Sequence, residues 1–329
     1  MTATIIDTEA GLQALAPEWA QLWQQAGSPP FQSPDWLLPW WGVFGTGQPR
    51  VAVLRAGGKL AALLPMYVLD EAPERKLLPI GVGLSDYCDA LIGPAAPAGS
   101  ASALLHAVLA RAVAEGVTSC TLPDLTPSAA LLAANPPPDW TEAALPDTPC
   151  PVLTLAGGIP AGQRRNIRQS RHRAECKGGW SAEIAIDPVT MWQVLTDMHR
   201  TRWTELGEPG GVLADPAVLA FHAAAIPRLA ASATLRIYVL RIGGQVAAVY
   251  HTLKAADALC FYLSGFDAAY AAASPGTLLM GHIVDQAAVE GVTELHFLRG
   301  AERYKYAWGA TDRMNRSRLL TPSVRNASG

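Results

Sequence analysis

The densest group of reactive side chains in this sequence is RGAERYKYAWG, residues 299–309. It holds a carboxylate, two phenols and three cations directly after a short apolar segment, and ligand sites in sheet proteins often lie where such a segment ends. Glu302 could take up a proton, Tyr304 could give one, and Arg299 or Lys305 could pair with an anionic group. An ordinary hairpin with an aromatic core face and a solvated charged face would produce a similar pattern.

The alternation of side chains within this run predicts which residues share a side. In an extended chain, Tyr304, Tyr306 and Trp308 would face one way, and Arg303 and Lys305 would face the other. The aromatic side would then pack inward, and the cations would be free to meet a ligand.

A second candidate is the helix start in SPGTLLMGHIVDQ, residues 274–286. Ser274 is a good N-cap, Pro275 suits the first helical position, and Gly276 lets a ligand approach the backbone closely. The free N–H groups of such a start attract phosphates, which makes Thr277 a further candidate contact. The same start also caps ordinary helices that bind nothing.

Two further residues could act on a proton. His199 lies near the end of a predicted helix and titrates near neutral pH, as a general base requires, although a helical His followed by Arg and Trp is also common as a packing residue. Asp86 lies in a loop between Ser85 and Tyr87, where a carboxylate either contacts substrate or closes an Asx-turn.

The composition excludes several classes of protein. Half of the 329 residues are hydrophobic and 16% are charged, which fits a compact globular chain. A formal charge of −3 gives no overall attraction to nucleic acid or anionic membrane. Five scattered cysteines disfavour a disulfide framework and fit a reducing cytosol. Because the N-terminus lacks a signal-peptide pattern and no window approaches about 18 apolar residues, we expect a cytoplasmic protein without a membrane span.

Absent motifs narrow the chemistry further. The sequence has no Walker-type loop, no His-Glu-x-x-His, no Gly-x-Ser-x-Gly and no Gly-x-Gly-x-x-Gly after a strand. Nucleotide hydrolysis, zincin chemistry, the common serine hydrolase layout and dinucleotide binding are therefore not leading candidates. We expect no metal.

The elements that must position these side chains occur in two similar halves. The block Val53-Leu54-Arg55-x-Gly57-Gly58-x-x-Ala61-Ala62 recurs as Val239-Leu240-Arg241-x-Gly243-Gly244-x-x-Ala247-Ala248, and each predicts a hairpin. Glu115-Gly116-Val117-Thr118 recurs as Glu290-Gly291-Val292-Thr293, each time between a predicted helix and a predicted strand. The proline-rich stretch 123–160 separates the halves. We therefore predict duplicated domains at 1–150 and 151–329, with a helix at 31–45 that breaks at Pro39.

Several segments together resemble a known family. They are SDY at 85–87, RRNIRQSRHRAE at 164–175, HRTRW at 199–203, the SPG-L-L helix start at 274–279 and FLRGAERYKYAWGA at 297–310. The sequence resembles the BioF2-like, CelD-type acetyltransferases of the GNAT superfamily. Related tandem-GNAT proteins include the FemABX peptidyltransferases, which take aminoacyl groups from tRNA.

The resemblance implies an α/β fold of tandem GNAT-like domains, each a mixed, mostly antiparallel sheet flanked by helices. It implies an N-acyltransferase in which an amine directly attacks the acyl group of acetyl-CoA or another acyl-CoA, with no permanently bound cofactor. The acceptor would be an amino sugar or another cell-envelope building block. We expect catalytic roles for Asp86, His199, Glu302, Tyr304 and Lys305. Donor contacts are expected from Ser274, Gly276, Thr277 and Arg299. Substrate contacts are expected from Tyr87, Arg202, Trp203 and Trp308.

One departure from the family keeps two alternatives open. GNAT enzymes cradle the coenzyme A pyrophosphate in a glycine-rich turn, whereas residues 270–276 here contain one glycine and a proline without an N–H. The first alternative is a FemABX-like transferase that uses aminoacyl-tRNA. The second is a catalytically silent binding subunit of a polysaccharide synthesis system.

The basic run at 164–177 bears on these alternatives. Its cations are Arg164, Arg165, Arg168, Arg171, Arg173 and Lys177. Such a run is often just a solvated helix face, but it could also bind coenzyme A phosphates, an anionic glycan, a lipid headgroup or tRNA. No aromatic residues interleave with the cations, so stacking on single-stranded bases has little support.

Overall fold

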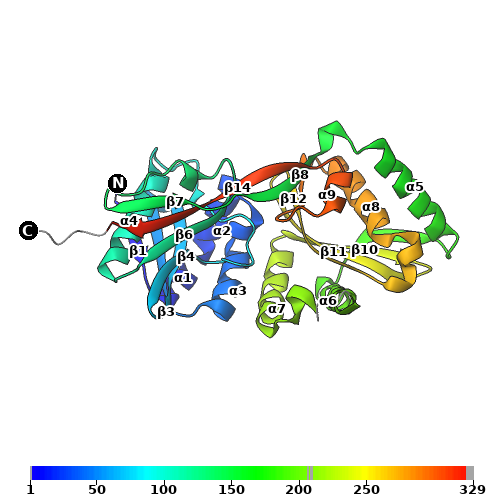
Figure 1. Ribbon diagram of the computed structural model, residues 1–329, viewed down its shortest axis with the longest axis horizontal. Helices are drawn as coiled ribbons and strands as arrows, with labels where there is room; N and C mark the ends of the chain where they lie inside the picture. The colour runs from blue at the N-terminus through cyan, green and yellow to red at the C-terminus, as the bar shows by residue number, and fades with distance from the viewer. Residues whose placement is uncertain (1, 206, 208–209, 324–329) are drawn as a thin grey trace, which may run out of the picture. The chain divides into compact units, whose positions relative to one another are not determined.

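The computed structural model describes residues 2–205, 207 and 210–323, and these residues form two compact units (Figure 1). The first unit comprises Met1–Thr148 together with the segment that begins at Arg313, and the second comprises Pro149–Asp312. The sequence-based division assigned everything after residue 150 to the second domain. The segment from Arg313 belongs instead to the first unit, because its strand pairs with strands of that unit.

The first unit is built on a mixed sheet. Its strands are β1 (Thr4–Ile6), β2 (Gln48–Ala56), β3 (Lys59–Glu71), β4 (Glu74–Pro79), β5 (Leu91–Ile92), β6 (Ser119–Leu125), β7 (Trp140–Ala144) and β14 (Thr311–Pro322). They run in the order β1-β2-β3-β4-β6-β14, with β5 beside β3 and β7 beside β14. The pairing is antiparallel except between β4 and β6. The helices are α1 (Glu9–Ala14), α2 (Ala16–Ala26), α3 (Pro34–Phe44) and α4 (Ser100–Ala114), with short turns η1 (Pro30–Gln32) and η2 (Ala130–Leu132).

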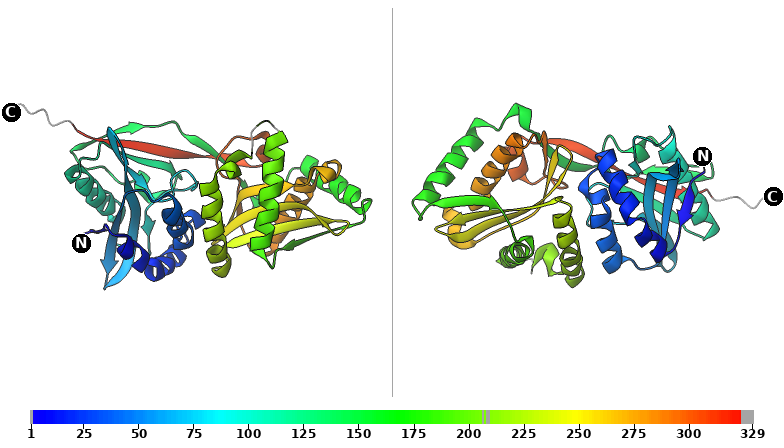
Figure 2. Two further views of the ribbon diagram at one scale, coloured as in Figure 1. Left: turned by 90° about the horizontal axis from the view of Figure 1, so that it is seen from below. Right: turned by 180° about the vertical axis from the view of Figure 1, so that it is seen from behind.

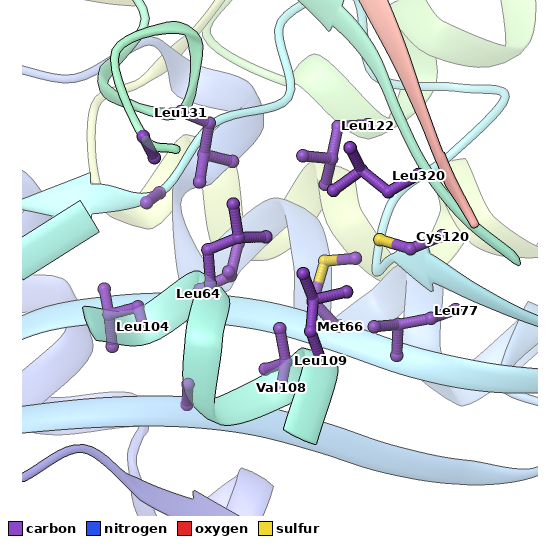
Figure 3. Close-up of a cluster of buried hydrophobic side chains, with 14 of the residues drawn as sticks. Leu64, Met66, Leu77, Leu104, Val108, Leu109, Cys120, Leu122, Leu131 and Leu320 are labelled. Atoms are coloured by element: carbon purple, nitrogen blue, oxygen red, sulfur yellow. The ribbon is translucent and has the colours of Figure 1, made fainter. Parts of the chain in front are cut away.

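Helix α4 covers one face of this sheet. Leu104, Val108 and Leu109 recur at helical spacing and meet Leu64 and Met66, which alternate along β3 (Figure 3). Leu320 of β14 joins the same core and is fully buried, so the C-terminal strand is part of the first unit's interior.

Helix α3 differs from its sequence prediction. We expected a break at Pro39, but the helix runs through it from Pro34 to Phe44. Trp36, Trp40 and Trp41 are all buried on this helix. Burial of large indoles stabilises the helix by more than the single backbone hydrogen bond that Pro39 removes.

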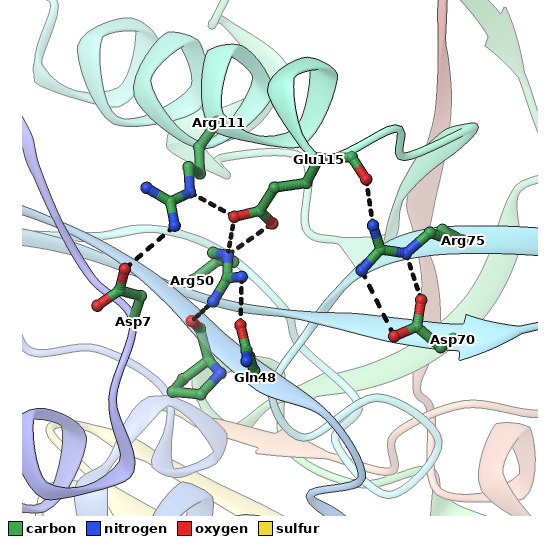
Figure 4. Close-up of polar contacts among 8 residues, drawn as sticks. Asp7, Gln48, Arg50, Asp70, Arg75, Arg111 and Glu115 are labelled. Carbon is green, nitrogen blue, oxygen red and sulfur yellow. Dashed lines mark hydrogen bonds and ion pairs between the residues drawn. The ribbon is translucent and has the colours of Figure 1, made fainter.

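A charged cluster joins α4 to the sheet at its edge. Arg50, which is 3% exposed, pairs with Glu115 at 2.8 Å, and Glu115 also pairs with Arg111 (Figure 4). Arg111 reaches Asp7 at 3.2 Å on its other side. Because Arg50 also donates to the carbonyl of Pro49 at 2.7 Å, its buried charge is compensated by several acceptors.

The second unit is built on a separate run of strands. They are β8 (Thr148–Thr154), β9 (Trp180–Ile184), β10 (Leu235–Ile242), β11 (Gln245–Ala255), β12 (Ala258–Phe266) and β13 (Glu294–His296). Their order is β8-β13-β12-β11-β10-β9, and only β12 and β13 are parallel. The helices are α5 (Ala161–Glu175), α6 (Pro188–Glu205), α7 (Pro216–Ala231), α8 (Pro275–Val289) and α9 (Arg303–Ala307), with turns η3 (Leu155–Gly157), η4 (Gly211–Ala214) and η5 (Ala268–Ala273).

Helices cover both faces of this second sheet. Helix α8 packs on one face, with α5 outside it, and α6 and α7 pack on the other (Figures 1 and 2). Leu278, Leu279 and Ile283 of α8 meet Leu240 of β10 in the core. Gly281 lets α5 approach closely, since a Cβ there would lie 2.9 Å from the side chain of Ile167. None of the described helices is long and apolar enough to cross a bilayer.

The two predicted hairpins are confirmed, and they match in detail. Gly57 and Gly58 have φ angles of 56° and 81°, and Gly243 and Gly244 have 57° and 81°. The pairing of each hairpin also shifts register at the same place, after Leu54 in the first unit and after Leu240 in the second. The sequence repeat therefore corresponds to a repeat in structure.

Candidate functional site

Strands β12 and β13 of the second unit run together for only a short distance. Ala258–Cys260 pair with Glu294–His296, whereas β12 continues to Phe266. The chain beyond β13 turns away through Leu298, whose φ is +61°. The two strands therefore separate beyond Cys260, and we refer to residues 261–266 of β12 as the splayed edge.

A β-bulge interrupts β12 within the splayed edge. Phe261 pairs with Thr252 and Leu263 pairs with His251, so Tyr262 has no opposite residue in β11. A bulge re-aims the neighbouring backbone and side chains, and bulges are common beside active sites. The splayed edge can thus present backbone N–H groups of the type that stabilise an oxyanion.

A phenol lies between this edge and the start of α8. Tyr250 of β11 lies directly opposite Ser264 of β12. Burial raises the pKa of Tyr250, and the hydroxyl of Ser264 opposes that rise through a hydrogen bond. The Tyr250 hydroxyl lies 3.7 Å from the position that a Cβ on Gly276 would occupy. The sheet, the helix start and a polar hydroxyl therefore meet at one point.

Aromatic rings line the approach to that point. Phe261 of the splayed edge stacks on Phe297 with ring centroids 5.4 Å apart. Tyr250 packs edge-on against Phe261 at 5.6 Å, and Tyr304 packs edge-on against Phe297 at 6.3 Å. The two phenols therefore flank one stacked pair of rings, which can shelter an apolar chain and still offer two hydroxyl groups.

The start of α8 differs from its sequence prediction in one respect. Ser274 is the N-cap residue, but its backbone is left-handed (φ 50°, ψ 59°) and its side chain makes no capping hydrogen bond. The expectation that its side chain caps the helix is wrong, because side-chain capping requires an extended backbone at this position. Gly276 and Thr277 are half-buried in the first turn, where helix N–H groups lack intrahelical partners. Their role as donor contacts stays a prediction.

The run after β13 is a short helix, so the expected alternation is wrong. Residues Arg303–Ala307 form α9, which turns Lys305 inward to 3% exposure and leaves Tyr304 53% exposed. Trp308 is buried at the end of the helix, within the core of the unit. The physical reason is that the carbonyls of 298–300 attract the Lys305 ammonium, which an extended chain would have directed into solvent.

Lys305 is therefore committed to the backbone of its own loop. Its Nζ donates to the carbonyls of Leu298 at 3.3 Å, Arg299 at 2.7 Å and Gly300 at 3.1 Å. It also pairs with Glu302 at 2.8 Å. These contacts show Lys305 holding the loop in shape.

The phenol of Tyr304 stays protonated near neutral pH. Burial, followed by the nearby charge of Glu302, raises the pKa of Tyr304 to about 12, although half of the whole side chain is exposed. Its role as a proton donor stays a prediction.

His199 lies on the other face of β12, on α6. Its Nδ1 donates to the carbonyl of Ser264 at 3.2 Å, so Nε2 carries the lone pair. Nε2 is buried, and among the described residues it has no hydrogen-bond partner. Burial lowers the pKa of His199, and the carbonyl of Ser264 partly opposes this. The imidazole is thus neutral near pH 7 and able to accept a proton.

Two residues of the predicted substrate group, Arg202 and Trp203, lie close to His199 on α6. The ring of Trp203 lies 5.8 Å from that of His199 and is half-buried. The guanidinium of Arg202 lies 4.6 Å from the ring of Phe266 at the end of β12. Both side chains therefore border the splayed edge from the face opposite α8.

Asp86 and Tyr87 lie in the first unit, and both are buried. The backbone carbonyl of Asp86 accepts a hydrogen bond from Asn315 at 3.2 Å, and the ring of Tyr87 packs edge-on against Phe31 at 5.9 Å. Their catalytic and substrate roles stay predictions.

The structure thus brings together only part of the predicted set. Tyr304 reaches the splayed edge through Phe297, Gly276 through Tyr250 and His199 through Ser264. Lys305 supports the loop beside it. Sequence reasoning missed the lining residues Tyr250, Phe261, Ser264 and Phe297. Tyr250, Phe261 and Ser264 lie in strands with no motif around them, and Phe297 opens the run at 297–310 without a reactive group of its own. Only the pairing of the strands could therefore have identified these residues.

No group of three or more metal-ligating side chains gathers anywhere in the described part of the chain. The polar groups at the splayed edge are hydroxyls, backbone N–H groups and one imidazole. Such groups suit hydrogen bonding and proton transfer.

Comparisons with known proteins agree with this geometry. Residues 161–306, somewhat less than half of the chain, match the acetyltransferase (GNAT) domain family. The match covers the splayed edge, α8 and α9. No protein of curated function matches the chain in sequence.

Solved structures show the fold of the whole chain. FemX is similar with a TM-score of 0.66 and 10% identity, covering 98% of this chain and 97% of that one. A Bacteroides thetaiotaomicron protein of unknown function has a TM-score of 0.60 and 10% identity, and the match covers 97% of this chain and 100% of that one. The C-terminal domain of a putative lysylphosphatidylglycerol synthetase from Agrobacterium fabrum has a TM-score of 0.57 and 12% identity, and the match covers 96% of this chain and 93% of that one. The chain has a tandem GNAT-like fold, as its sequence predicted.

Proposed function

We propose that this chain is an N-acyltransferase that transfers an acetyl or other acyl group from acyl-CoA to an amine. The observation that carries the proposal is the splayed edge of β12, with Tyr250 and Tyr304 beside it and the first turn of α8 at its end. An extended acyl-bearing chain could lie along this edge, and its phosphates could meet the helix start.

Each chemical task then has a candidate group. Backbone N–H groups at the bulge beside Tyr262 would stabilise the oxyanion. Nε2 of His199 would accept the proton of the attacking amine, because it is neutral and carries the lone pair. Tyr304 would protonate the departing thiolate. The amine would attack the bound thioester directly, without a covalent enzyme intermediate.

Finer assignments rest on the sequence resemblance. Within the GNAT superfamily we place the chain with the BioF2-like, CelD-type acetyltransferases, on the strength of the run at 297–310. That group implies a cytoplasmic enzyme whose acceptor is an amino sugar or another cell-envelope precursor.

A thermal-shift assay tests the donor. Acetyl-CoA at about 100 times its Kd should stabilise the native protein by about 2.7 kcal/mol, because a ligand that binds only the folded state raises its stability. Gly276→Asp should abolish this shift, since the new carboxylate would lie beside Tyr250 and repel a phosphate. The fold should tolerate the change, because an acidic residue in the first turn favours a helix.

The matched control is Gly162→Asp, which makes the same change at the second position of α5, where a Cβ meets no atom within 4 Å. It should leave the acetyl-CoA shift intact. If acetyl-CoA does not raise the melting temperature of the natural protein, acyl-CoA is not its donor.

A FemABX-like use of aminoacyl-tRNA is the second candidate. The observation that favours it is the start of α8, where Pro275 offers no N–H and residues 270–276 contain a single glycine. Salt-sensitive tRNA binding without any acetyl-CoA shift would support it. If the protein binds neither acetyl-CoA nor tRNA, the remaining candidate is a non-catalytic binding subunit.

A further inference from the structure

Helix α5 concentrates positive charge on an otherwise acidic protein. Residues 164–177 hold six Arg and Lys and one Glu, a net charge of +5, whereas the whole chain carries −3. The remaining residues therefore carry −8. The proposed acyl transfer uses none of these cations.

The cations form one broad face. The helix buries Gln163, Ser170 and Ala174 toward α8 and leaves every arginine exposed. At 100° per residue, four of the five arginines fall within about 120° of the helix circumference. These four are Arg164, Arg165, Arg168 and Arg171. A flat anionic surface can engage all of them at once, and the only acidic residue of the helix is Glu175 in its last turn.

The face also carries a shallow, open hollow, which is lined by Arg165, Arg168, Gln169, His172 and Arg173. Guanidinium groups bind phosphate with two parallel hydrogen bonds, so this hollow suits a phosphate headgroup.

Strand β9 follows α5 directly in the chain and carries apolar side chains. The guanidinium of Arg171 lies 5.2 Å from the ring of Trp180, which is half-buried. Ile184 alternates onto the same side as Trp180 and is 42% exposed, and Ile186 beyond it is fully exposed. β9 ends the strand order of its unit, so its outer side has no neighbouring strand among the described residues.

We propose that the cationic face of α5, together with Trp180 and Ile184 of β9 and Ile186 just beyond it, docks the protein onto an anionic phospholipid bilayer. Arginines bind the phosphates, Trp180 lies at headgroup level, and Ile184 and Ile186 enter the acyl boundary. Exposed isoleucines on the segment that follows the cationic helix favour a bilayer over a nucleic acid, because a polyphosphate strand offers them nothing apolar to enter.

Vesicle sedimentation with the full chain tests this proposal. Binding is expected to vesicles of phosphatidylcholine with about one-third phosphatidylglycerol and not to phosphatidylcholine alone, and it should weaken as salt shortens the Debye length. The double variant R165Q/R168Q should bind roughly 30-fold more weakly, about five-fold for each arginine. Ile186→Ser should weaken binding roughly three- to ten-fold with no change in salt dependence.

The matched control is R200Q/R228Q, which removes the same charge from exposed positions on α6 and α7, on the opposite face of the sheet. It should bind vesicles as the natural protein does. Equal binding to both kinds of vesicle would overturn the proposal, and so would equal losses in the two double variants. Retention of duplex RNA but not of vesicles, lost in R165Q/R168Q, would assign the face to nucleic acid instead. None of these outcomes depends on acyl transfer.

Discussion

The ammonium of Lys305 donates to the backbone carbonyl of Arg299 at 2.7 Å and is 97% buried. Two further carbonyls and Glu302 complete its contacts. This one side chain closes the turn between β13 and α9, and the turn sets the position of Tyr304 relative to Phe297. A cation that sequence reasoning directed toward a ligand thus supports the loop that carries the candidate acid.

Lys305→Met should lower the free energy of unfolding by about 2–4 kcal/mol, because three buried or part-buried carbonyls lose their donor and Glu302 loses its partner. Urea unfolding measures the change. Arg303→Met, at an exposed neighbouring position, should stay within about 0.5 kcal/mol. A Lys305→Met protein as stable as the natural one would show that the loop does not need the ammonium.

Tyr304→Phe should lower kcat with acetyl-CoA by roughly 10²-fold or more, because the leaving thiolate loses its proton donor. The melting temperature should change little, since Tyr304 is half exposed. Because the pKa of Tyr304 is raised to about 12, ionisation of this phenol should not limit the rate below about pH 11. Tyr306→Phe, which removes a hydroxyl that donates to Asp312 at 2.8 Å, is the matched control and should retain kcat.

Stability should fall in acid because of a buried imidazole. His251 is fully buried beside Trp192, His222 and Tyr262, and burial lowers the pKa of His251 to about 3. The unfolded chain, with a His pKa near 6.5, binds the proton that the folded chain refuses. The contribution of His251 is therefore fully present above pH 6.5 and is lost as pH falls toward 3, by about 1.4 kcal/mol per pH unit.

His251→Leu should reduce this slope between pH 6 and 4 in urea titrations. Burial also lowers the pKa of His222 well below its usual value, and the charge of His251 adds to that effect, so part of the slope should remain. His106→Leu, at an exposed position, should leave the slope unchanged. An unaltered slope in His251→Leu would contradict the assignment.

Gly265→Ala should destabilise the second unit by about 1–3 kcal/mol. A Cβ at this position would lie 2.8 Å from Met198 Cβ and 3.0 Å from the carbonyl of Leu195, so α6 would have to move away from β12. The contact between His199 and Ser264 should loosen with it. Gly42→Ala is the opposing control. No atom lies within 4 Å of the position that a Cβ on Gly42 would occupy, so this change should raise the free energy of unfolding by about 0.5–1 kcal/mol. Thermal unfolding distinguishes the two signs.

Local patterns predicted much of the fold. The Gly-Gly pairs at 57–58 and 243–244 specify tight hairpins because two successive residues must adopt positive φ. The helix of residues 274–286 begins where Ser274 and Pro275 indicated, although the serine does not cap it with its side chain. The alternation predicted for 299–309 was wrong for a different reason, because the carbonyls of residues 298–300 draw Lys305 inward and the run forms a helix.

The sequence by itself determined the two-fold repeat, the hairpins and the helix starts, since each depends on residues close together in the chain. Only the tertiary structure decided that Tyr250 lies opposite Ser264. The turn after Ala255 would pair Tyr250 with Leu263, and the bulge at Tyr262 moves the pairing by one residue. Only the tertiary structure showed that the segment from Arg313 belongs to the first unit. The first depends on a bulge inside a hairpin, and the second depends on backbone hydrogen bonds between strands far apart in sequence. Any side chain can accompany those bonds.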